Sequence, residues 1–291
     1  MANLKRRLAT NVAGNFFVDA TCINCDTCRQ LAPKSFKEEG DYSAVARQPE
    51  GDTELLQAYQ ALLACPVGSI GTERSDKLRL QEAMRSFPLL LEDGVYYNGF
   101  NSEKSFGGNS YFIRHPDGNW LVDSPRYVGR LINAFEEMGG IRTIFLTHED
   151  DVADSARYAE HFGAMRIIHR ADAAASPGAE RVVDGEEPIV VSEAFQIIPV
   201  PGHTEGSMAL LYDRRFLFSG DHLWWDPERR ALSAPERLVW DGERLLTSVA
   251  KLLDHPFEWV LPGHGDRICL TAVEAAAHLE RLLERRREMG R

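Results

Sequence analysis

Apolar and polar positions alternate along this chain in two distinct ways. Between residues 89 and 122, short apolar runs are separated by Asp-Gly and Gly-Gly pairs, a spacing typical of hairpins. The strands expected there are residues 89–91, 95–97, 110–114 and 120–122. Further on, an apolar run over residues 141–146 is followed by helical spacing through Phe162. Hairpins followed by strand–helix alternation predict a mixed sheet sandwich flanked by helices.

A charged segment separates this region from the N-terminal part of the chain. Residues 74–85 have a helical pattern and lead to Ser86-Phe87-Pro88, which we interpret as a linker. The length of 291 residues also favours two domains. We therefore expect domains at residues 1–80 and 81–291, and a solvated terminal helix where acidic and basic residues alternate over residues 280–291.

Four apolar runs of the second domain stop abruptly at residues that can bind metal. The motifs read L-T-H-E-D-D-V-A-D-S (146–155), P-V-P-G-H-T-E-G-S (199–207), L-F-S-G-D-H (217–222) and V-L-P-G-H-G (260–265). Glycine lets the backbone turn tightly, so that a His or Asp can point back towards a shared centre. Four strand ends of this kind predict a metal site.

The charge of the chain restricts its partners. The net charge is −11 and the pI is near 5.3, which argues against a nucleic-acid partner because phosphate binding needs a basic groove. We find neither the roughly 18 apolar residues of a membrane span nor the apolar core of a signal peptide. We therefore expect a cytoplasmic protein with no membrane partner.

Cysteines are concentrated near the N-terminus. Cys22, Cys25 and Cys28 form C-x2-C-x2-C, Cys65 precedes a proline, and Cys269 stands apart. In an intracellular chain such a group is expected to bind a metal or cluster rather than to form disulfides. A structural zinc site is one alternative, although zinc sites usually present pairs of cysteines.

The cysteine spacing resembles that of bacterial ferredoxins, C-x2-C-x2-C-x3-C-P. Ala32 occupies the fourth position here, with Pro33 retained, and Cys65-Pro66 supplies a distant fourth ligand. The segment therefore resembles a ferredoxin with a single [4Fe–4S] cluster. In such a domain, residues 16–19 and 69–72 are placed where the terminal strands pair.

The four strand-end motifs resemble, in their order, those of the metallo-β-lactamase fold superfamily, in its glyoxalase II-like branch. The resemblance runs from about Phe87 to the C-terminus and implies a four-layer αββα sandwich. It implies that His148 and His203 bind one metal, that His264 binds a second, and that Asp221 bridges the two.

The first motif departs from the family pattern T-H-x-H-x-D-H. Asp150 stands where the second His belongs, and without a gap Val152 and Ala153 fill the next two ligand positions. If the alignment instead allows two inserted residues, Asp154 and Ser155 occupy those two ligand positions. One His ligand is missing in either alignment. The expected ligands are His148, Asp150, Asp154, His203, Asp221 and His264. The number of metal ions, one or two, and their identity, zinc or iron, both stay open.

Three functions follow from these resemblances. In a hydrolase, metal-bound hydroxide oriented by Asp154 would attack the carbonyl of an ester, thioester or similar small molecule. Alternatively, carboxylate in place of imidazole favours iron, as in the flavodiiron oxygen and nitric oxide reductases of the superfamily, and the cluster would supply electrons. A third possibility is a non-catalytic scaffold with a degenerate metal site.

The role of the cluster stays equally open at this stage. It would transfer electrons with a redox partner protein, sense redox state or support the fold. The sequence does not name the substrate or the oligomeric state. The chain after His264 is too short for the long helical extension of a true glyoxalase II.

Overall fold

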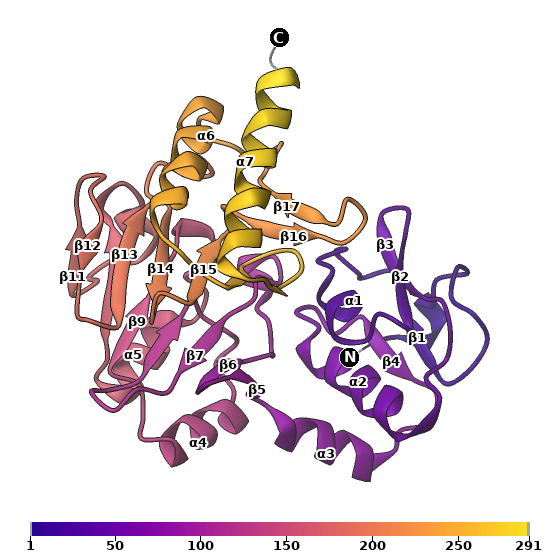
Figure 1. Ribbon diagram of the computed structural model, residues 1–291. Helices are drawn as coiled ribbons and strands as arrows, with labels where there is room; N and C mark the ends of the chain where they lie inside the picture. The colour runs from indigo at the N-terminus through magenta and orange to yellow at the C-terminus, as the bar shows by residue number, and fades with distance from the viewer. Residues whose placement is uncertain (1, 290–291) are drawn as a thin grey trace. The chain divides into compact units, whose positions relative to one another are not determined.

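The computed structural model describes residues 2–289, which divide into two compact units, Met1–Arg142 and Thr143–Arg291 (Figure 1). Each unit is described by itself. Among the described residues, none of the helices is long and apolar enough to span a bilayer. The expected boundary near residue 80 falls inside the first unit and stays a prediction.

The first unit begins with a small α+β region that holds the cysteine motif. Strand β1 (Phe16–Val18) pairs antiparallel with β4 (Ile70–Thr72), as expected for the terminal strands of a small ferredoxin. The other elements are η1 (Leu4–Arg6), α1 (Thr27–Leu31), the hairpin β2 (Phe36–Glu39) and β3 (Tyr42–Val45), and α2 (Gly51–Ala64). Phe16 packs edge-on against Tyr59 of α2, with ring centroids 5.0 Å apart. This packing joins the sheet to the long helix of the region.

The rest of the first unit is a meander of antiparallel strands. Helix α3 (Lys77–Ser86) begins at Asp76, whose carboxylate accepts from the first free backbone N–H groups of the helix. It leads to β5 (Leu89–Glu92), β6 (Val95–Tyr97), η2 (Glu103–Ser105), β7 (Tyr111–Ile113), β8 (Trp120–Val122) and α4 (Gly129–Glu137). Phe112 of β7 stacks on Phe135 of α4 with centroids 4.8 Å apart. The expected strands and the helix before them are confirmed.

The second unit opens with strand–helix alternation. Its parallel strands are β9 (Thr143–Phe145), β10 (Met165–His169) and β11 (Arg181–Val183), with η3 (Glu149–Asp151), α5 (Ser155–Phe162) and η4 (Arg170–Ala175) between them. Helix α5 ends at Gly163, which has the left-handed conformation common at helix C-termini. The strand-to-helix sequence expected after residue 141 is therefore present.

A mixed six-stranded sheet forms the rest of the second unit, in the order β12-β13-β14-β15-β18-β19. Its strands are β12 (Ile189–Val190), β13 (Phe195–Pro199), β14 (Met208–Tyr212), β15 (Phe216–Gly220), β18 (Trp259–Pro262) and β19 (Ile268–Cys269). The remaining elements are the hairpin β16 (Trp224–Asp226) and β17 (Ala231–Ser233), α6 (Gly242–Lys251), η5 (Leu252–Asp254) and α7 (Ala272–Met289).

Helices α6 and α7 share one apolar core with this sheet (Figure 1). Leu217 of β15 and Val260 of β18 are fully buried in the same cluster as Val249 of α6 and Leu279 of α7. Because β15 and β18 are parallel neighbours, their C-terminal ends lie at the same edge of the sheet. That edge carries the residues Asp221 and His264.

Candidate cluster and metal sites

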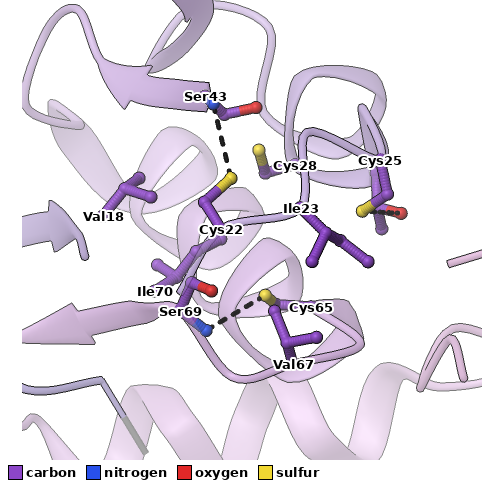
Figure 2. A pocket seen from close by; sticks show the side chains of 11 residues that line it. Val18, Cys22, Ile23, Cys25, Cys28, Ser43, Cys65, Val67, Ser69 and Ile70 are labelled. Carbon is purple, nitrogen blue, oxygen red and sulfur yellow. Dashed lines mark hydrogen bonds between the residues drawn. The ribbon is translucent and has the colours of Figure 1, made fainter. Parts of the chain in front are cut away.

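Four cysteine side chains surround one pocket in the first unit (Figure 2). Cys22 and Cys25 come from the loop before α1, Cys28 from its first turn, and Cys65 caps the C-terminus of α2. Asn24 and Asp26 have positive φ angles of 55° and 63°, which bend the loop tightly between the cysteines. The pocket is otherwise lined mainly by apolar residues, including Val18, Ile23, Val67 and Ile70.

Backbone amides are directed at two of these sulfurs. Cys22 Sγ accepts from the N–H groups of Asn24 and Ser43, each at 3.4 Å, and Cys65 Sγ accepts from Ser69 N at 3.3 Å. Figure 2 shows the bonds from Ser43 and Ser69. Such bonds stabilise thiolate rather than thiol and help to set the potential of an iron–sulfur cluster.

Burial works against the ionised form of three of the four cysteines. It raises the pKa of Cys25 to about 12, although bonds from Thr27 oppose the shift, and it also raises the pKa of Cys28 and Cys65. Apolar walls therefore disfavour free thiolates, and bound iron is the cation that would neutralise them. Four cysteines, donors aimed at sulfur and a dry pocket fit a cluster better than a solvent-exposed redox pair.

The candidate metal centre lies in the second unit, at the ends of β9, β13, β15 and β18. His148 follows β9, His203 follows β13, Asp221 follows β15 and His264 follows β18. These are the four side chains that match the family motifs without a gap. They lie close together, as the strand-end pattern predicted.

One group of donors consists of His148, His203 and Asp221. Asp221 Oδ2 lies 3.8 Å from His148 Nε2 and 3.7 Å from His203 Nε2. Asp150 Oδ2 lies 3.4 Å from His203 Nε2 and 3.8 Å from His148 Nε2. Two donors bound tetrahedrally at about 2.1 Å from one ion are about 3.4 Å apart. These spacings fit three donors around a common metal, with Asp150, which lies outside the group, close to both of its histidines.

A second group consists of Asp151, Asp221 and His264. His264 Nδ1 is 2.9 Å from both carboxylate oxygens of Asp221. Asp221 therefore belongs to both groups, as expected for a bridging ligand.

The second group contains a residue that the motif alignment missed. Asp151 is almost fully buried in η3, whereas Asp154 was expected to be the ligand. Among the described residues, Asp154 and Ser155 lie outside both donor groups, at the start of α5. His222, a conceivable substitute for the missing imidazole, is also outside them, and burial lowers its pKa to about 3.

Glycine at position 263 is required by the closeness of the two carboxylates. A Cβ atom there would lie 2.6 Å from Asp221 Oδ1 and 2.7 Å from Asp151 Oδ2, closer than a real Cβ approaches. The motif P-G-H-G therefore serves two purposes, because it supplies His264 and leaves room for carboxylates beside it.

Two polar contacts hold the histidine loops in position. The Oγ1 of Thr147 is 2.9 Å from His148 Nδ1, so a proton on Nδ1 leaves the Nε2 lone pair facing the donor group. Asp172 accepts from Thr204 Oγ1 at 2.7 Å, Gly206 N at 3.0 Å and Glu149 N at 3.1 Å. This buried carboxylate ties the loop of His148 to the loop of His203. Asp172 follows the end of strand β10, and this position after a strand was the signal available in the sequence.

Electrostatics prepare Asp221 to bind cations. Burial opposes its ionisation, but His264, His148 and His203 outweigh that effect and hold its pKa below the ordinary value. Burial lowers the pKa of His148, so this ring is a neutral donor. His203 differs, because Asp150 and Asp221 outweigh its burial and raise its pKa.

Comparison with known families first identifies the cysteine segment. Residues 18–72 match the family model of the 4Fe-4S single cluster domain of ferredoxin I. That segment contains all four cysteines of the pocket.

Two curated relatives match part of the chain. A hydroxyacylglutathione hydrolase of Xanthomonas oryzae is 32% identical over 110 residues, covering 37% of this chain and 43% of the relative. One of Hydrogenovibrio crunogenus is 33% identical over 107 residues, covering 36% and 39%. The chain thus spans less than half the length of these relatives.

Solved structures share the fold at lower identity. DIM-1 metallo-β-lactamase exposed to ceftazidime has a TM-score of 0.51 and 16% identity, covering 67% of this chain and 94% of its own. The mono-zinc form of FIM-1 from Pseudomonas aeruginosa has a TM-score of 0.51 and 18% identity, covering 67% and 93%. The chain thus joins a segment of the single-cluster ferredoxin family to a domain with the metallo-β-lactamase fold.

Proposed function

We propose that this protein is a metal-dependent hydrolase of ester or thioester substrates that carries one [4Fe–4S] cluster in its N-terminal segment. The observation that carries the proposal is the sharing of Asp221 between two groups of metal donors. A carboxylate between two such groups suits a pair of ions that act on one substrate. The curated relatives are named hydroxyacylglutathione hydrolases, which favours a thioester.

The proposed ligands form two sets, one for each of two ions. One ion would be held by His148, His203 and Asp150, and the other by Asp151 and His264. Asp221 would bind both ions. We assign the ligand role to Asp151 in preference to Asp154, because it is Asp151 that lies with Asp221 and His264. Bound ions would supply an acidified water as nucleophile and a Lewis acid for the substrate carbonyl.

Protein groups keep these ligands in the form that binds. Asp221 is ionised before a cation arrives, since its contact with His264 helps to hold its pKa below the ordinary value. The contact between Thr147 and His148 fixes the orientation of one imidazole, and Asp172 fixes the two loops relative to each other. Asp150 is exposed to solvent and its Oδ2 lies 3.4 Å from His203 Nε2, so it would bind the ion on the side from which water reaches the donor group.

The test is a combined metal and activity measurement on protein purified anaerobically without added metal. We expect about four irons and four acid-labile sulfides per chain for one cluster, with additional zinc or iron at the second centre. Thioester cleavage would be followed by the release of free thiol from S-acyl glutathiones. Protein with both metal positions filled that cleaves no ester or thioester would overturn the hydrolase proposal.

An iron-dependent redox function is the second candidate, and one observation favours it. Three carboxylates, those of Asp150, Asp151 and Asp221, accompany three imidazoles at the centre, and oxygen donors shift preference from zinc towards iron or manganese. Iron in excess of sulfide by about one or two atoms, with little zinc, would support it. The cluster would then pass electrons to a small oxidant bound at the centre. If cluster metals alone are found, the non-catalytic scaffold becomes the better account.

A further inference from the structure

We propose that the segment from Tyr97 to Arg126, which lies outside the ferredoxin match, packs against the cysteine segment behind the cluster pocket and sets the lifetime and reduction potential of the cluster. We call this segment the cluster wall. It belongs to the same compact unit as the four cysteines. The inference depends on the proposed cluster function, and the experiments below separate the failure of one from the failure of the other.

The wall touches a cluster ligand at Gly107. A Cβ atom built there would lie 2.7 Å from Cys25 Cβ, 2.9 Å from Cys25 Sγ and 3.1 Å from Pro66 Cγ. Gly107 also has a φ of +89°, which other residues rarely adopt. The backbone of the wall therefore covers Cys25 as closely as a main chain can, and the space admits no side chain.

A hydrogen-bond relay connects the wall to the same ligand. Asn101 Nδ2 is 2.6 Å from the Gly107 carbonyl, which can only accept, so the amide nitrogen faces this side. The same nitrogen lies 3.1 Å from Thr27 Oγ1, and Tyr97 Oη donates to Asn101 Oδ1 at 2.7 Å. Thr27 Oγ1 lies 3.4 Å from both Cys25 Sγ and the Gly107 carbonyl, so its hydroxyl contacts a cluster ligand and the wall together. Asn101 thus connects the wall to Thr27, and through Thr27 to Cys25.

The wall is also bonded to the chain just before the fourth cysteine. Asn101 N donates to the Ala64 carbonyl at 3.1 Å, and Arg126 Nη2 donates to the Leu63 carbonyl at 2.7 Å. Within the wall, Arg126 N donates to the Phe100 carbonyl at 2.9 Å. These contacts hold the end of α2, where Cys65 is located, against the wall.

Arg126 additionally places a positive charge near the cluster site. Burial lowers the pKa of this guanidinium, and the proximity of Cys65 acts in the opposite direction. Arginine stays charged in proteins despite such burial. When a reductant such as dithionite transfers one electron, the cluster gains one negative charge. A nearby guanidinium therefore stabilises the reduced form and raises the potential.

The first experiment compares Gly107→Ala with Gly40→Ala in the full chain. Gly40 also has a positive φ, +60°, but no atom lies within 4 Å of its Cβ position, so this control carries the backbone strain without the clash. The readout is the loss of visible cluster absorbance in air with a chelator present. We expect loss about tenfold faster than wild type in Gly107→Ala, because overpacking displaces Cys25 or the wall. Equal rates in the two variants would overturn the role of the wall.

The second experiment measures the midpoint potential of the cluster in Arg126→Gln, Arg126→Lys and Arg114→Gln. We expect a more negative potential in Arg126→Gln, little change in Arg126→Lys, and none in Arg114→Gln, which removes an exposed arginine of the same unit. Unchanged potential in Arg126→Gln would contradict the electrostatic part. Wild-type protein that contains no acid-labile sulfide would instead refute the proposed cluster, which is a separate outcome.

Discussion

The cluster pocket and the metal centre solve the problem of holding metal in opposite ways. Three of the proposed cluster ligands lie within seven consecutive residues, and burial raises the pKa of Cys25, Cys28 and Cys65. The proposed ligands of the metal centre come from four distant strand ends, and His264 helps to hold the pKa of Asp221 below its ordinary value. The cysteines of the pocket therefore stay protonated as thiols until iron binds, whereas the Asp221 carboxylate of the centre is ionised before metal binds. The contrast teaches that the cluster site depends on its cofactor more than the metal centre does.

The sharpest test of this contrast is Asp221→Asn. Both donor groups lose their common carboxylate, so we expect loss of both metals and turnover at least about 100-fold lower. Inductively coupled plasma mass spectrometry and an acid-labile sulfide assay would measure the two sites in the same sample. Sulfide and its matching iron should be unchanged, because the cysteines are in the other unit. Retention of full metal content would contradict the bridging role.

A smaller effect should distinguish the two candidate carboxylates of the first motif. We expect Asp151→Asn to lose one metal of two, because Asp151 is grouped with Asp221 and His264, and Asp154→Asn to keep both. The two variants are matched controls, since each neutralises one buried carboxylate of the same loop. The measurement is metal content after dialysis against a weak chelator. The reverse pattern would restore Asp154 as the ligand.

Removal of the carboxylate that joins the two histidine loops should weaken the centre without emptying it. We expect Asp172→Asn to lower metal affinity by about 10-fold to 100-fold, as is common for residues that orient ligands. Asp184→Asn is the control, because Asp184 pairs with Arg170 at the surface. Competition with a chromogenic chelator gives the affinities, and circular dichroism checks the fold. Equal affinities in the two variants would assign Asp172 a role in folding alone.

The mildest perturbation is a change of pH. Neighbouring carboxylates raise the pKa of His203 above its ordinary value, so below that pKa the protonated ring cannot bind metal. Asp221 remains ionised over the same range, because its pKa is lowered. We expect metal affinity to fall as the pH is lowered from well above to below the ordinary imidazole pKa of about 6.5, with the loss beginning above that value, and to recover when the pH is raised again. Affinity that stays constant across this range would rule out His203 as a ligand.

Local patterns were enough to predict the parts of the molecule that depend on neighbours in sequence. The spacing of Cys22, Cys25 and Cys28 predicted the ferredoxin-type segment, and Asp-Gly and Gly-Gly pairs located the hairpins. The strand-end motifs also predicted that Asp221 and the histidines that match the family motifs lie close together, because parallel strands place their ends at one edge of a sheet.

The other residues of the centre depend on loop geometry, which the spacing of residues along the sequence does not describe. After His148 the chain makes a 3-10 turn, and Ala153 then has a φ of +33°, so positions no longer follow the family alignment. That is why Asp151 was missed. Asp172 and the crowding at Gly263 arise from contacts between segments distant in sequence. A pattern within one motif cannot reveal them.

The cluster wall has a consequence for how this chain can be cut and recombined. A fusion of a ferredoxin to another domain is often pictured as an exchangeable cassette joined by a linker. Here the buried amide of Asn101 and the bare backbone at Gly107 fit the cysteine segment specifically. A transplant that ends after the helix α3 would leave that fit behind, so a working chimera has to carry the strands up to β8 as well. The smallest transferable part is larger than the recognisable motif.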